Sequence, residues 1–244
     1  MPPPAPGGAT SPARGEGLPG VGVGDYRGLR AAAPVAPARP VVSDQLGDLL
    51  PARDGHFRFE SGHHGDLWLE LDLLHLRPAL VRPFAAELGR RLSAHGVEAV
   101  CGPLTGGAYL ALAVALDLEI AFCATEGSAA PGAEGLFPVE YRLPAALWPA
   151  LTGRRVAVVD DVVNAGSAAG GTVAALRRAG AVPVALGALL VLGAGAAALA
   201  AREGLALERL AERPANLWTP AECPLCAAGV ALDAGVRPPP AAPP

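Results

Sequence analysis

The feature that most constrains the fold of this chain is a run of small apolar residues that ends in two carboxylates and a turn. Residues 156–159 are apolar, Asp160 and Asp161 follow, and residues 164–167 read Asn-Ala-Gly-Ser. Residues 168–179 then have the apolar spacing of a helix. A buried strand that turns through Gly into a helix directs backbone N–H groups and the positive end of the helix dipole at one point. The stretch therefore predicts a site for a phosphorylated sugar, with amides for the phosphate and carboxylates for the hydroxyls.

A plain strand-to-helix turn is the alternative for this stretch. Acidic residues would then be solvated or would cap the helix, as Asp often does. An apolar strand seldom ends in an acidic pair without a ligand for the carboxylates to receive. Here strand, acidic pair, small-residue loop and helix occur together, so we favour a binding site over a plain turn.

A second, glycine-rich strand-to-helix loop lies earlier in the chain. Thr105, Gly106 and Gly107 follow an apolar run at residues 97–101 and precede a helical segment at residues 108–116. Such a loop again collects backbone N–H groups for an anion. Because doubly wound folds bind ligands at the carboxyl ends of parallel strands, we expect both loops to meet at one edge of a sheet.

Strands and helices alternate along the chain, which predicts an α/β fold with a doubly wound, mostly parallel sheet flanked by helices. The expected strands are residues 97–101, 119–124, 137–143, 156–159 and 182–192, and the expected helices are residues 43–50, 78–95, 108–116, 168–179 and 194–202. Residues 207–210 and 214–218 are expected to form the remaining short elements. The segment at residues 125–136 is rich in small residues. It indicates either a mobile lid over the site or a plain surface hairpin.

Alternating apolar residues before these units predict an N-terminal β-hairpin that covers one end of the domain as a hood. Its apolar positions are Phe57, Phe59, Leu67, Leu69 and Leu71, and its turn is Ser61 and Gly62. Three histidines, His56, His63 and His64, lie in or beside it. Such residues can act as bases or ligands, but for His63 we favour an exposed turn position.

Composition divides the chain into one domain with two tails. Residues 1–40 are rich in Pro, Ala and Gly and poor in large apolar residues. They cannot bury enough surface to offset their ordering entropy, so we expect disorder there and, by the same reasoning, at residues 236–244. The folded domain is expected at residues 41–220, followed by a C-terminal CxxC turn at residues 221–235.

Charge and hydropathy exclude two classes of partner. The net charge is −4, so no basic face for nucleic acid is expected. Residues 180–201 carry no charge, but they contain Pro183 and several glycines, and a buried parallel strand followed by a helix explains them better than a membrane span. The first residues lack the pattern of a secretory signal. All 19 basic residues are Arg, so a mechanism that requires a lysine is excluded.

The four cysteines fall into two pairs of different character. Cys101 and Cys123 end apolar, strand-like runs and are expected to be buried packing residues. Cys223 and Cys226 form a CxxC, which is half of a structural Zn²⁺ site. The other half would come from histidines or from another subunit. The alternative is a reduced cysteine pair on a tight turn.

Residues 160–167 resemble the phosphoribosyl pyrophosphate (PRPP) signature of the type I phosphoribosyltransferases, in which two acidic residues precede a small-residue loop. The resemblance implies that Asp160 and Asp161 receive the ribose hydroxyls of PRPP and are the catalytic residues. It also implies a PRPP site made of Asp160, Asp161, Val162, Val163, Asn164, Ala165, Gly166, Ser167, Ala168, Thr105, Gly106 and Gly107. Within this set, Thr105 to Gly107 would hold the pyrophosphate.

The hairpin resembles that of orotate phosphoribosyltransferases, which has the form F-x-L-x-S-G-x-x-S-x-x-[YF]. The matching residues are Phe57, Phe59, Ser61, Gly62 and Trp68, and the likeness extends over about residues 43–210. The resemblance implies transfer of the phosphoribosyl group from PRPP to a nucleobase, orotate foremost, with release of pyrophosphate. It implies Mg²⁺ carried mainly by PRPP, a homodimer in the cytoplasm, and base contacts from Ser61, Gly62, Trp68, Leu69 and Asn164.

Several positions depart from the orotate pattern. Glu60 stands where the family has a basic residue, Gly106 stands where it has Lys, and residues 125–136 contain no basic residue, with Arg142 the nearest. Three hypotheses follow. The chain is an active phosphoribosyltransferase, a non-catalytic PRPP- or nucleotide-binding regulatory protein of the same fold, or a zinc-knuckle interaction protein with a vestigial site.

Overall fold

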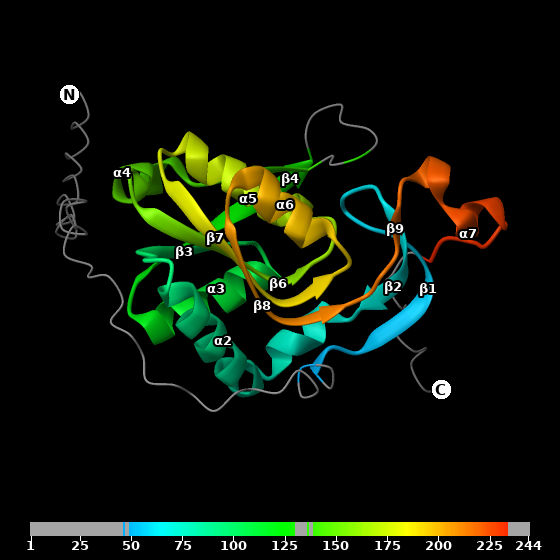
Figure 1. The fold of residues 1–244 in the computed structure, drawn as a ribbon, viewed down its shortest axis with the longest axis horizontal. Coiled ribbons are helices and arrows are strands. Elements are labelled where there is room, and N and C mark those ends of the chain that lie inside the picture. Colours follow the sequence, from blue (N-terminus) through cyan, green and yellow to red (C-terminus); the bar gives the residue numbers. More distant parts are fainter. Residues whose placement is uncertain (1–45, 47–48, 130–135, 137–138, 234–244) are drawn as a thin grey trace, which may run out of the picture.

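The structure is a computed structural model that describes residues 46, 49–129, 136 and 139–233 of the chain. The tails predicted at residues 1–40 and 236–244 lie outside the described residues, as does most of the helix predicted at residues 43–50. A large and a small sheet organise the rest (Figure 1). The large sheet contains β3 (Ala99–Pro103), β4 (Ala121–Ala129), β5 (Val139–Arg142), β6 (Arg155–Val163), β7 (Val182–Leu192) and β8 (Ala206–Arg213). The small one contains β1 (Ala52–Arg58), β2 (His64–Leu69) and β9 (Leu217–Trp218).

The large sheet has the order β5-β4-β3-β6-β7-β8, and all its neighbouring pairs are parallel except the β4–β5 edge. The order reverses direction at β3 and β6, the two strands that carry the predicted anion loops. Because β3 and β6 pair in parallel, with Cys101 opposite Val158, both loops leave the same edge. This confirms the predicted α/β class and places the two loops side by side.

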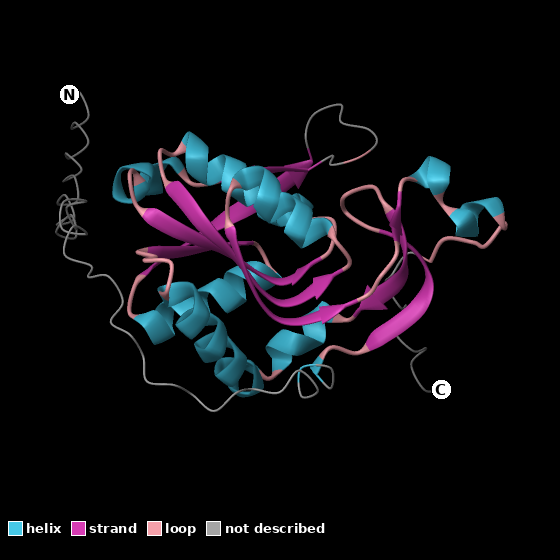
Figure 2. Ribbon diagram, in the orientation of Figure 1, coloured by secondary structure: helices cyan, strands magenta, loops and turns pink. Residues whose placement is uncertain are grey.

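Helices cover both faces of the large sheet (Figure 2). On one face lie α2 (Pro78–Ser93), α3 (Gly106–Leu118) and the short η2 (Leu71–Leu76), and on the other lie α4 (Trp148–Leu151), α5 (Ser167–Arg178) and α6 (Gly195–Glu203). A short η3 (Ala145–Leu147) precedes α4. Each face has its own apolar core, with Leu88 and Leu92 of α2 in one and Leu176 and Leu199 in the other. Cys101 and Cys123 are buried, as predicted.

Two predicted strand ends fall four or more residues short of the observed ones. The strand ending at Val159 continues through the acidic pair to Val163, and the strand ending at Ala124 continues to Ala129. In both strands, hydrogen bonding to a neighbouring strand continues past the polar residues. β6 pairs with β7 as far as Val163, and β4 pairs with β5 over Glu126 to Ala129. Five of the twelve residues in the predicted flexible segment, 125–129, are therefore strand, while residues 130–135 lie outside the described part of the chain.

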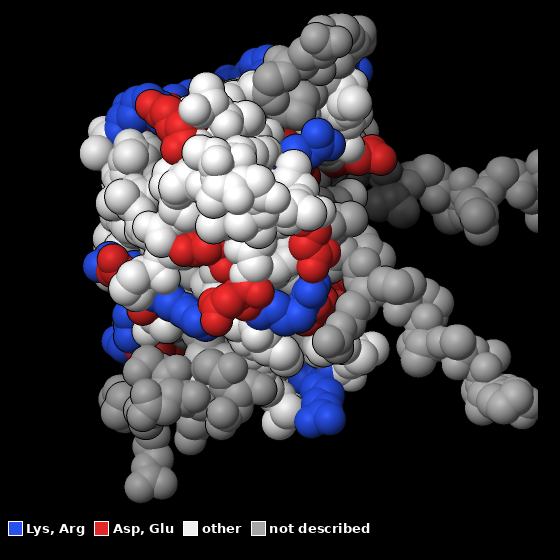
Figure 3. Space-filling model, turned by 90° about the vertical axis from the view of Figure 1, so that its right-hand side faces the viewer, with Lys and Arg blue, Asp and Glu red and all other residues white. Residues whose placement is uncertain are grey.

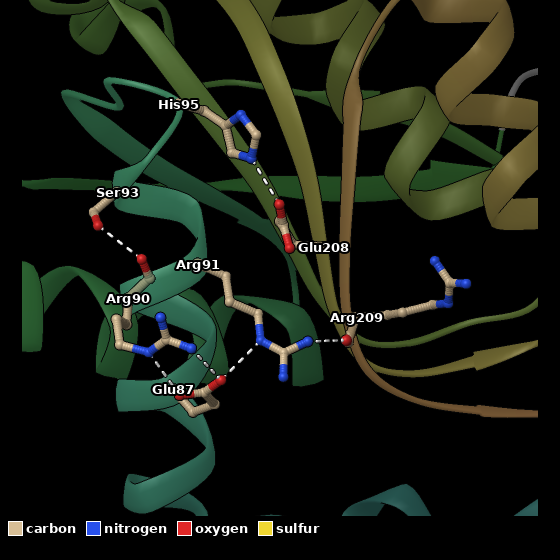
Figure 4. A network of polar contacts seen from close by, with 7 residues as sticks. All are labelled: Glu87, Arg90, Arg91, Ser93, His95, Glu208 and Arg209. Carbon is tan, nitrogen blue, oxygen red and sulfur yellow. Dashed lines mark hydrogen bonds and ion pairs between the residues drawn. The ribbon is translucent and has the colours of Figure 1, made fainter. Parts of the chain in front are cut away.

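A buried carboxylate connects the end of α2 to the edge strand β8 (Figure 4). Glu87 is buried and accepts hydrogen bonds from Arg90 at 2.7 and 2.9 Å and from Arg91 at 2.8 Å. Arg91 also donates to the carbonyl oxygen of Arg209 at 2.7 Å. His95 contacts Glu208 of β8 at 2.7 Å. The guanidinium groups thus supply the charge that lets Glu87 stay buried and ionised.

The small sheet forms the predicted hood, joined by a C-terminal extension with η4 (Pro220–Glu222) and α7 (Pro224–Ala227). Figure 1 shows this unit at the end of the large sheet to which β6 and β7 point. Acidic and basic side chains are interspersed around a largely uncharged surface at that end (Figure 3). In the residues that the structure describes, no helix is long and apolar enough to cross a membrane, and residues 182–192 form strand β7 instead.

Candidate active site at the ends of β3 and β6

The acidic pair lies near the carboxyl end of β6, almost out of contact with solvent. Asp160 and Asp161 are 8% and 4% exposed. The backbone N–H of Asp161 donates to Oδ1 of Asp160 at 3.1 Å, and that of Val162 donates to Oδ1 of Asp161 at 2.8 Å. The second oxygens are left for other groups. Burying two adjacent carboxylates costs free energy unless each is paired with a basic side chain. A buried acidic pair of this kind is typical of a site that binds a polar ligand.

The turn after β6 brings the amide end of α5 to the same place. Gly166 adopts a left-handed conformation at φ 80° and precedes Ser167, the first residue of the helix. A side chain at that φ would be strained, so glycine allows the sharp turn. Ala168 in the first turn of this helix lines the same cavity as the acidic pair, so the unpaired N–H groups of that turn lie near the carboxylates.

The loop after β3 approaches the carboxylates so closely that only glycine fits. A Cβ atom at Gly106 would clash with Oδ2 of Asp161, and one at Gly107 would lie 2.5 Å from Oδ1 of Asp160. The backbone of this loop thus lies against both carboxylates. The same contact gives a structural reason why no lysine stands at position 106: its side chain would displace Asp161.

These residues enclose a polar cavity of about 370 Å³. Its lining is Glu60, Leu71, Asp72, His75, Pro103, Leu104, Thr105, Gly106, Gly107, Tyr109, Tyr141, Asp160, Asp161 and Ala168. Thus the structure brings together Thr105 to Gly107, the acidic pair and Ala168 from the predicted PRPP set. Four carboxylates and a single histidine line the cavity, and no Arg is among the described residues that do so.

The carboxylates of this cavity interact strongly with one another. Burial raises the pKa of Asp160 well above its ordinary value, and the neighbouring charges of Asp161 and Glu60 raise it further. Tyr141 donates its hydroxyl to Oε1 of Glu60 at 2.7 Å. Burial, followed by this carboxylate, raises the pKa of Tyr141, so it stays protonated. The contact joins the hairpin turn to strand β5 across the cavity.

His75 and Tyr109 are site residues that the sequence did not reveal. Nε2 of His75 lies 3.4 Å from Oδ2 of Asp161, and the ring of His75 meets that of Tyr109 edge-on at 5.0 Å. His75 lies in η2, which only the tertiary fold places against the loop after β3. A lone histidine in an apolar run gave no signal for this position.

A second, more apolar cavity of about 330 Å³ lies beside the first, and the two share Leu71 and Asp72. It is lined by Phe59, Leu67, Trp68, Leu69, Glu70, Leu71, Asp72, Val162, Asn164 and Leu192. The rings of Phe59 and Trp68 are parallel, with centroids 6.3 Å apart. Of the predicted base-binding set, Trp68, Leu69 and Asn164 line this cavity, whereas Ser61 and Gly62 form the hairpin turn outside its lining.

The other predicted ligand pair, Cys223 and Cys226, lies away from both cavities, against the hairpin. It meets His56 and His64 there, and the four ligand atoms lie within 4.8 Å of one another. His63, predicted to be an exposed turn residue, is half-buried with Nδ1 3.1 Å from the hydroxyl oxygen of Ser61. It takes no part in the Cys/His cluster.

Known proteins of similar sequence match most of the chain. No protein-family model matches the sequence. The chain is 29% identical to the orotate phosphoribosyltransferase of Pelotomaculum thermopropionicum over 184 residues, which cover 75% of this chain and 90% of the relative. It is 28% identical to the enzyme of the same name from Thermotoga maritima over 194 residues, or 79% of this chain and 94% of the relative. The crystal structure of orotate phosphoribosyltransferase from Aeropyrum pernix matches with a TM-score of 0.51 and 25% identity, over 70% of this chain and 94% of that one.

In sequence and in fold, the chain is similar to orotate phosphoribosyltransferases, which are members of the type I phosphoribosyltransferase family. Its large sheet with helices on both faces is the fold of that family. In this chain the loop after β3, the acidic end of β6 and the start of α5 border the polar cavity, and the hairpin borders the apolar one.

Proposed function

We propose that this protein transfers the 5-phosphoribosyl group from PRPP to a nucleobase, with orotate as the foremost acceptor, and releases pyrophosphate. The observation that carries the proposal is the contact between the loop after β3 and the acidic pair, where Gly106 and Gly107 lie directly against Asp161 and Asp160. One cavity can therefore hold ribose hydroxyls and pyrophosphate at once. The adjoining aromatic cavity, with Leu71 and Asp72 on the shared wall, suits a planar base.

Each part of the site has a role in this reaction. Asp160 and Asp161 accept hydrogen bonds from the ribose hydroxyls, and the backbone N–H groups from Val163 to Ser167 receive the 5′-phosphate. The bond from C1 of the ribose to the pyrophosphate oxygen breaks, and the oxygen keeps the electron pair. The base nitrogen supplies the pair for the new bond to C1. Positive charge develops on the ring between the two events, and the nearby carboxylates favour it.

The carboxylate lining fits the Mg²⁺ that the family uses with PRPP. Oxygen ligands suit this ion, which keeps several waters and binds through one or two carboxylates plus substrate phosphates. Asp160, Asp161 and Asp72 offer such oxygens in the polar cavity. When bound, the ion neutralises the charge that develops on the departing pyrophosphate. Four carboxylates would otherwise repel PRPP, so we expect its binding to depend strongly on Mg²⁺.

The apolar cavity supplies the contacts that a pyrimidine needs. Trp68 and Phe59 present aromatic surface for stacking, and the half-buried amide of Asn164 can both donate and accept hydrogen bonds at the base edge. Leu69 closes the wall of the cavity. Since Asn164 directly follows β6, the base edge and the ribose would be aligned by one strand.

A regulatory protein that binds PRPP or a nucleotide without turnover is the second candidate. It is favoured by the absence of Arg, in the part of the chain that the structure describes, from the polar cavity's lining. Loss of one preorganised donor to a developing negative charge costs about 3 kcal/mol of transition-state stabilisation. A site with few cationic donors could therefore bind PRPP with Mg²⁺ and still turn over slowly.

Pyrophosphate release separates these candidates. The full chain is incubated with PRPP and Mg²⁺, first with orotate and then with other bases, and pyrophosphate is measured together with PRPP affinity by calorimetry. We expect base-dependent release with orotate. If the protein binds PRPP but releases pyrophosphate with none of the bases, the result would favour a regulatory protein instead.

The acidic pair provides the site control. Asp160→Asn combined with Asp161→Asn should abolish PRPP binding in calorimetry, whereas Asp54→Asn on the exposed face of β1 should leave it unchanged. Binding that survives the double substitution would mean that PRPP does not use the end of β6.

A further inference from the structure

Two histidines of the hairpin and two cysteines of the C-terminal extension converge on one point. They are Nε2 of His56 on β1, Nδ1 of His64 on β2, and the Sγ atoms of Cys223 and Cys226 on either side of Pro224 and Leu225. His56, His64 and Cys223 are buried, and Cys226 is exposed. Residues more than 160 positions apart in the chain thus present four metal-ligand atoms within 4.8 Å of one another.

We propose that His56, His64, Cys223 and Cys226 bind a structural Zn²⁺ ion that fastens the C-terminal extension to the hairpin. The sequence alone showed only the Cys pair, and the fold supplies the two histidines. This site is separate from the PRPP site and does not depend on the proposed reaction.

Four of the six separations between the ligand atoms are close to the edges of a zinc tetrahedron. With zinc–nitrogen and zinc–sulfur bonds of about 2.0 and 2.3 Å, the edges are roughly 3.3 Å between two nitrogens and roughly 3.5 Å between nitrogen and sulfur. The two imidazole nitrogens are 3.2 Å apart. Nitrogen and sulfur are 3.3 Å apart for His56 and Cys223, 3.7 Å for His56 and Cys226, and 3.2 Å for His64 and Cys226.

Hydrogen bonds alone do not account for this convergence. Nδ1 of His56 lies 2.8 Å from the carbonyl oxygen of Val230, a contact in which the ring must donate. In the neutral ring Nε2 then carries one lone pair, yet it faces His64, Cys223 and Cys226 within 3.7 Å. One lone pair cannot serve three hydrogen-bonding partners, whereas a metal ion at the centre would satisfy all four groups.

The contact between His56 and Val230 is also what a zinc ligand requires. A ring nitrogen that donates to a carbonyl oxygen fixes the tautomer and the ring orientation, so the other nitrogen points at the metal. Further contacts hold the extension in place: the N–H of Asp233 donates to the carbonyl oxygen of His56 at 2.7 Å, and Arg53 forms an ion pair with Asp233 at 3.3 Å.

Donor chemistry and charge select zinc among the common metals. A tetrahedral set of two sulfurs and two nitrogens is typical of structural zinc. Two thiolates and Zn²⁺ sum to zero, so the complex can lie in a largely buried position without a net charge. All four protein ligands are in place, with no open position for a reacting water, which indicates a structural rather than a catalytic ion.

The ion would stabilise the hood that borders the apolar cavity. The small sheet is narrow, and its third strand has only two residues, so it has little core of its own. Phe57, which follows His56 in β1, packs against Trp68 of the cavity wall with ring centroids 5.6 Å apart. A metal bond between β1, β2 and α7 would therefore fix the hairpin on which the base-facing rings are carried.

Metal analysis of the full chain tests the proposal. Protein purified without chelators, or reconstituted with Zn²⁺ in reducing buffer, should contain one zinc ion per chain. His64→Asn and Cys226→Ser should each lose it, whereas the matched controls His63→Asn and Cys123→Ala should retain it. Replacement by Co²⁺ should give the sulfur charge-transfer and tetrahedral absorption bands, and both should vanish in Cys226→Ser.

A second measurement reports the structural role without relying on activity. Removal of zinc by a chelator should accelerate hydrogen exchange in Ala52–Arg58 and His64–Leu69, and leave exchange in β6 and β7 unchanged. The proposal is overturned if reconstituted protein binds neither metal. It is equally overturned if both ligand variants keep their zinc, or if mass spectrometry after alkylation shows Cys223 and Cys226 joined in a disulfide.

Discussion

Asp160, which we expect to bind the ribose, lowers the stability of the ligand-free protein. Its carboxyl is buried beside Asp161, and burial is the main reason that its pKa is raised. A group whose pKa is higher in the folded state than in the unfolded state destabilises the fold as pH rises above its ordinary value of about 3.9. The ligand-free protein should therefore lose stability toward neutral pH because of this side chain.

Asp160→Asn should stabilise the ligand-free protein. The amide keeps an oxygen to accept the N–H of Asp161 and carries no charge to desolvate. We expect the melting temperature at pH 7.5 to rise by roughly 2–4 °C, the equivalent of about 1 kcal/mol in a domain of this size. The gain should shrink as pH is lowered toward 4, because wild-type Asp160 is then protonated. Calorimetric scans at several pH values measure it, and a variant less stable than wild type at pH 7.5 would contradict it.

Gly106 is the second residue whose identity follows from its position. Its missing side chain leaves room for Oδ2 of Asp161. Gly106→Ala should displace either the loop or the carboxylate and weaken Mg²⁺-dependent PRPP binding by about tenfold, since one hydrogen bond to a charged group contributes about 1.5 kcal/mol. Gly89→Ala is the control, since a Cβ there would lie 3.4 Å from Leu118. Equal PRPP affinities for the two variants in calorimetry would mean that the loop after β3 does not bind PRPP.

At the scale of elements, the parallel units were predictable because their signals are local. The buried run at Val182–Leu192 and the small-residue turn before α5 each encode their structure within a dozen residues. The end of β6 was not predictable. The polar Asp160 and Asp161 indicate the end of a strand, but the pairing of β6 with β7 continues to Val163. Local sequence cannot report a partner strand.

The same reasoning separates the site residues that were found from those that were missed. The acidic pair lies near the carboxyl end of β6 and Gly106 to Gly107 follow β3, two strands whose direction is predictable, so their meeting was predictable too. His75, Tyr109 and the pairing of His56 with Cys223 depend on which elements lie side by side in the fold. Nothing within the hairpin indicates that a segment about 160 residues later will contact it.

The hydrogen bonds of Glu87 in α2 should contribute to the stability of the fold. Hydrogen bonds from Arg90 are the main reason that the pKa of Glu87 is lowered. Glu87→Gln should lower the free energy of unfolding by about 1–3 kcal/mol, because a buried acceptor loses charged donors. Urea denaturation near pH 7 measures this loss.

Glu212→Gln on the same edge of the sheet is the control, since its pair with Arg209 is exposed and should contribute less than about 0.5 kcal/mol. The pH dependence adds a second check. A lowered pKa means that the Glu87 contribution is present above the ordinary Glu value and is lost as pH falls through the lowered one. The stabilities of Glu87→Gln and wild type should therefore converge in acid, below the lowered pKa of Glu87. A Glu87→Gln variant as stable as wild type near pH 7 would show that the network is dispensable.

For the whole molecule, the helices beside the polar cavity leave an apolar face uncovered. Its large exposed side chains are Leu73 and Leu76 of η2, Leu80 of α2, and Tyr109, Leu112 and Leu116 of α3. These three elements pack against one another, so the residues belong to one side of the molecule. Apolar faces of this kind mark protein interfaces. We therefore expect a homodimer that buries η2, α2 and α3, as the resemblance to the family implies.

Leu112→Glu with Leu116→Glu should convert this dimer to a monomer, because two carboxylates would lose hydration at the interface. Light scattering coupled to size-exclusion chromatography measures the mass, and far-ultraviolet circular dichroism checks that the monomer remains folded. Val182→Glu, an exposed apolar position at the far end of β7, should stay dimeric.

Since Tyr109 and His75 belong both to this side and to the polar cavity, dissociation should also weaken PRPP binding. A wild-type protein that is monomeric at micromolar concentration would contradict the homodimer. A dimer that survives both substitutions would show that its interface does not include α3.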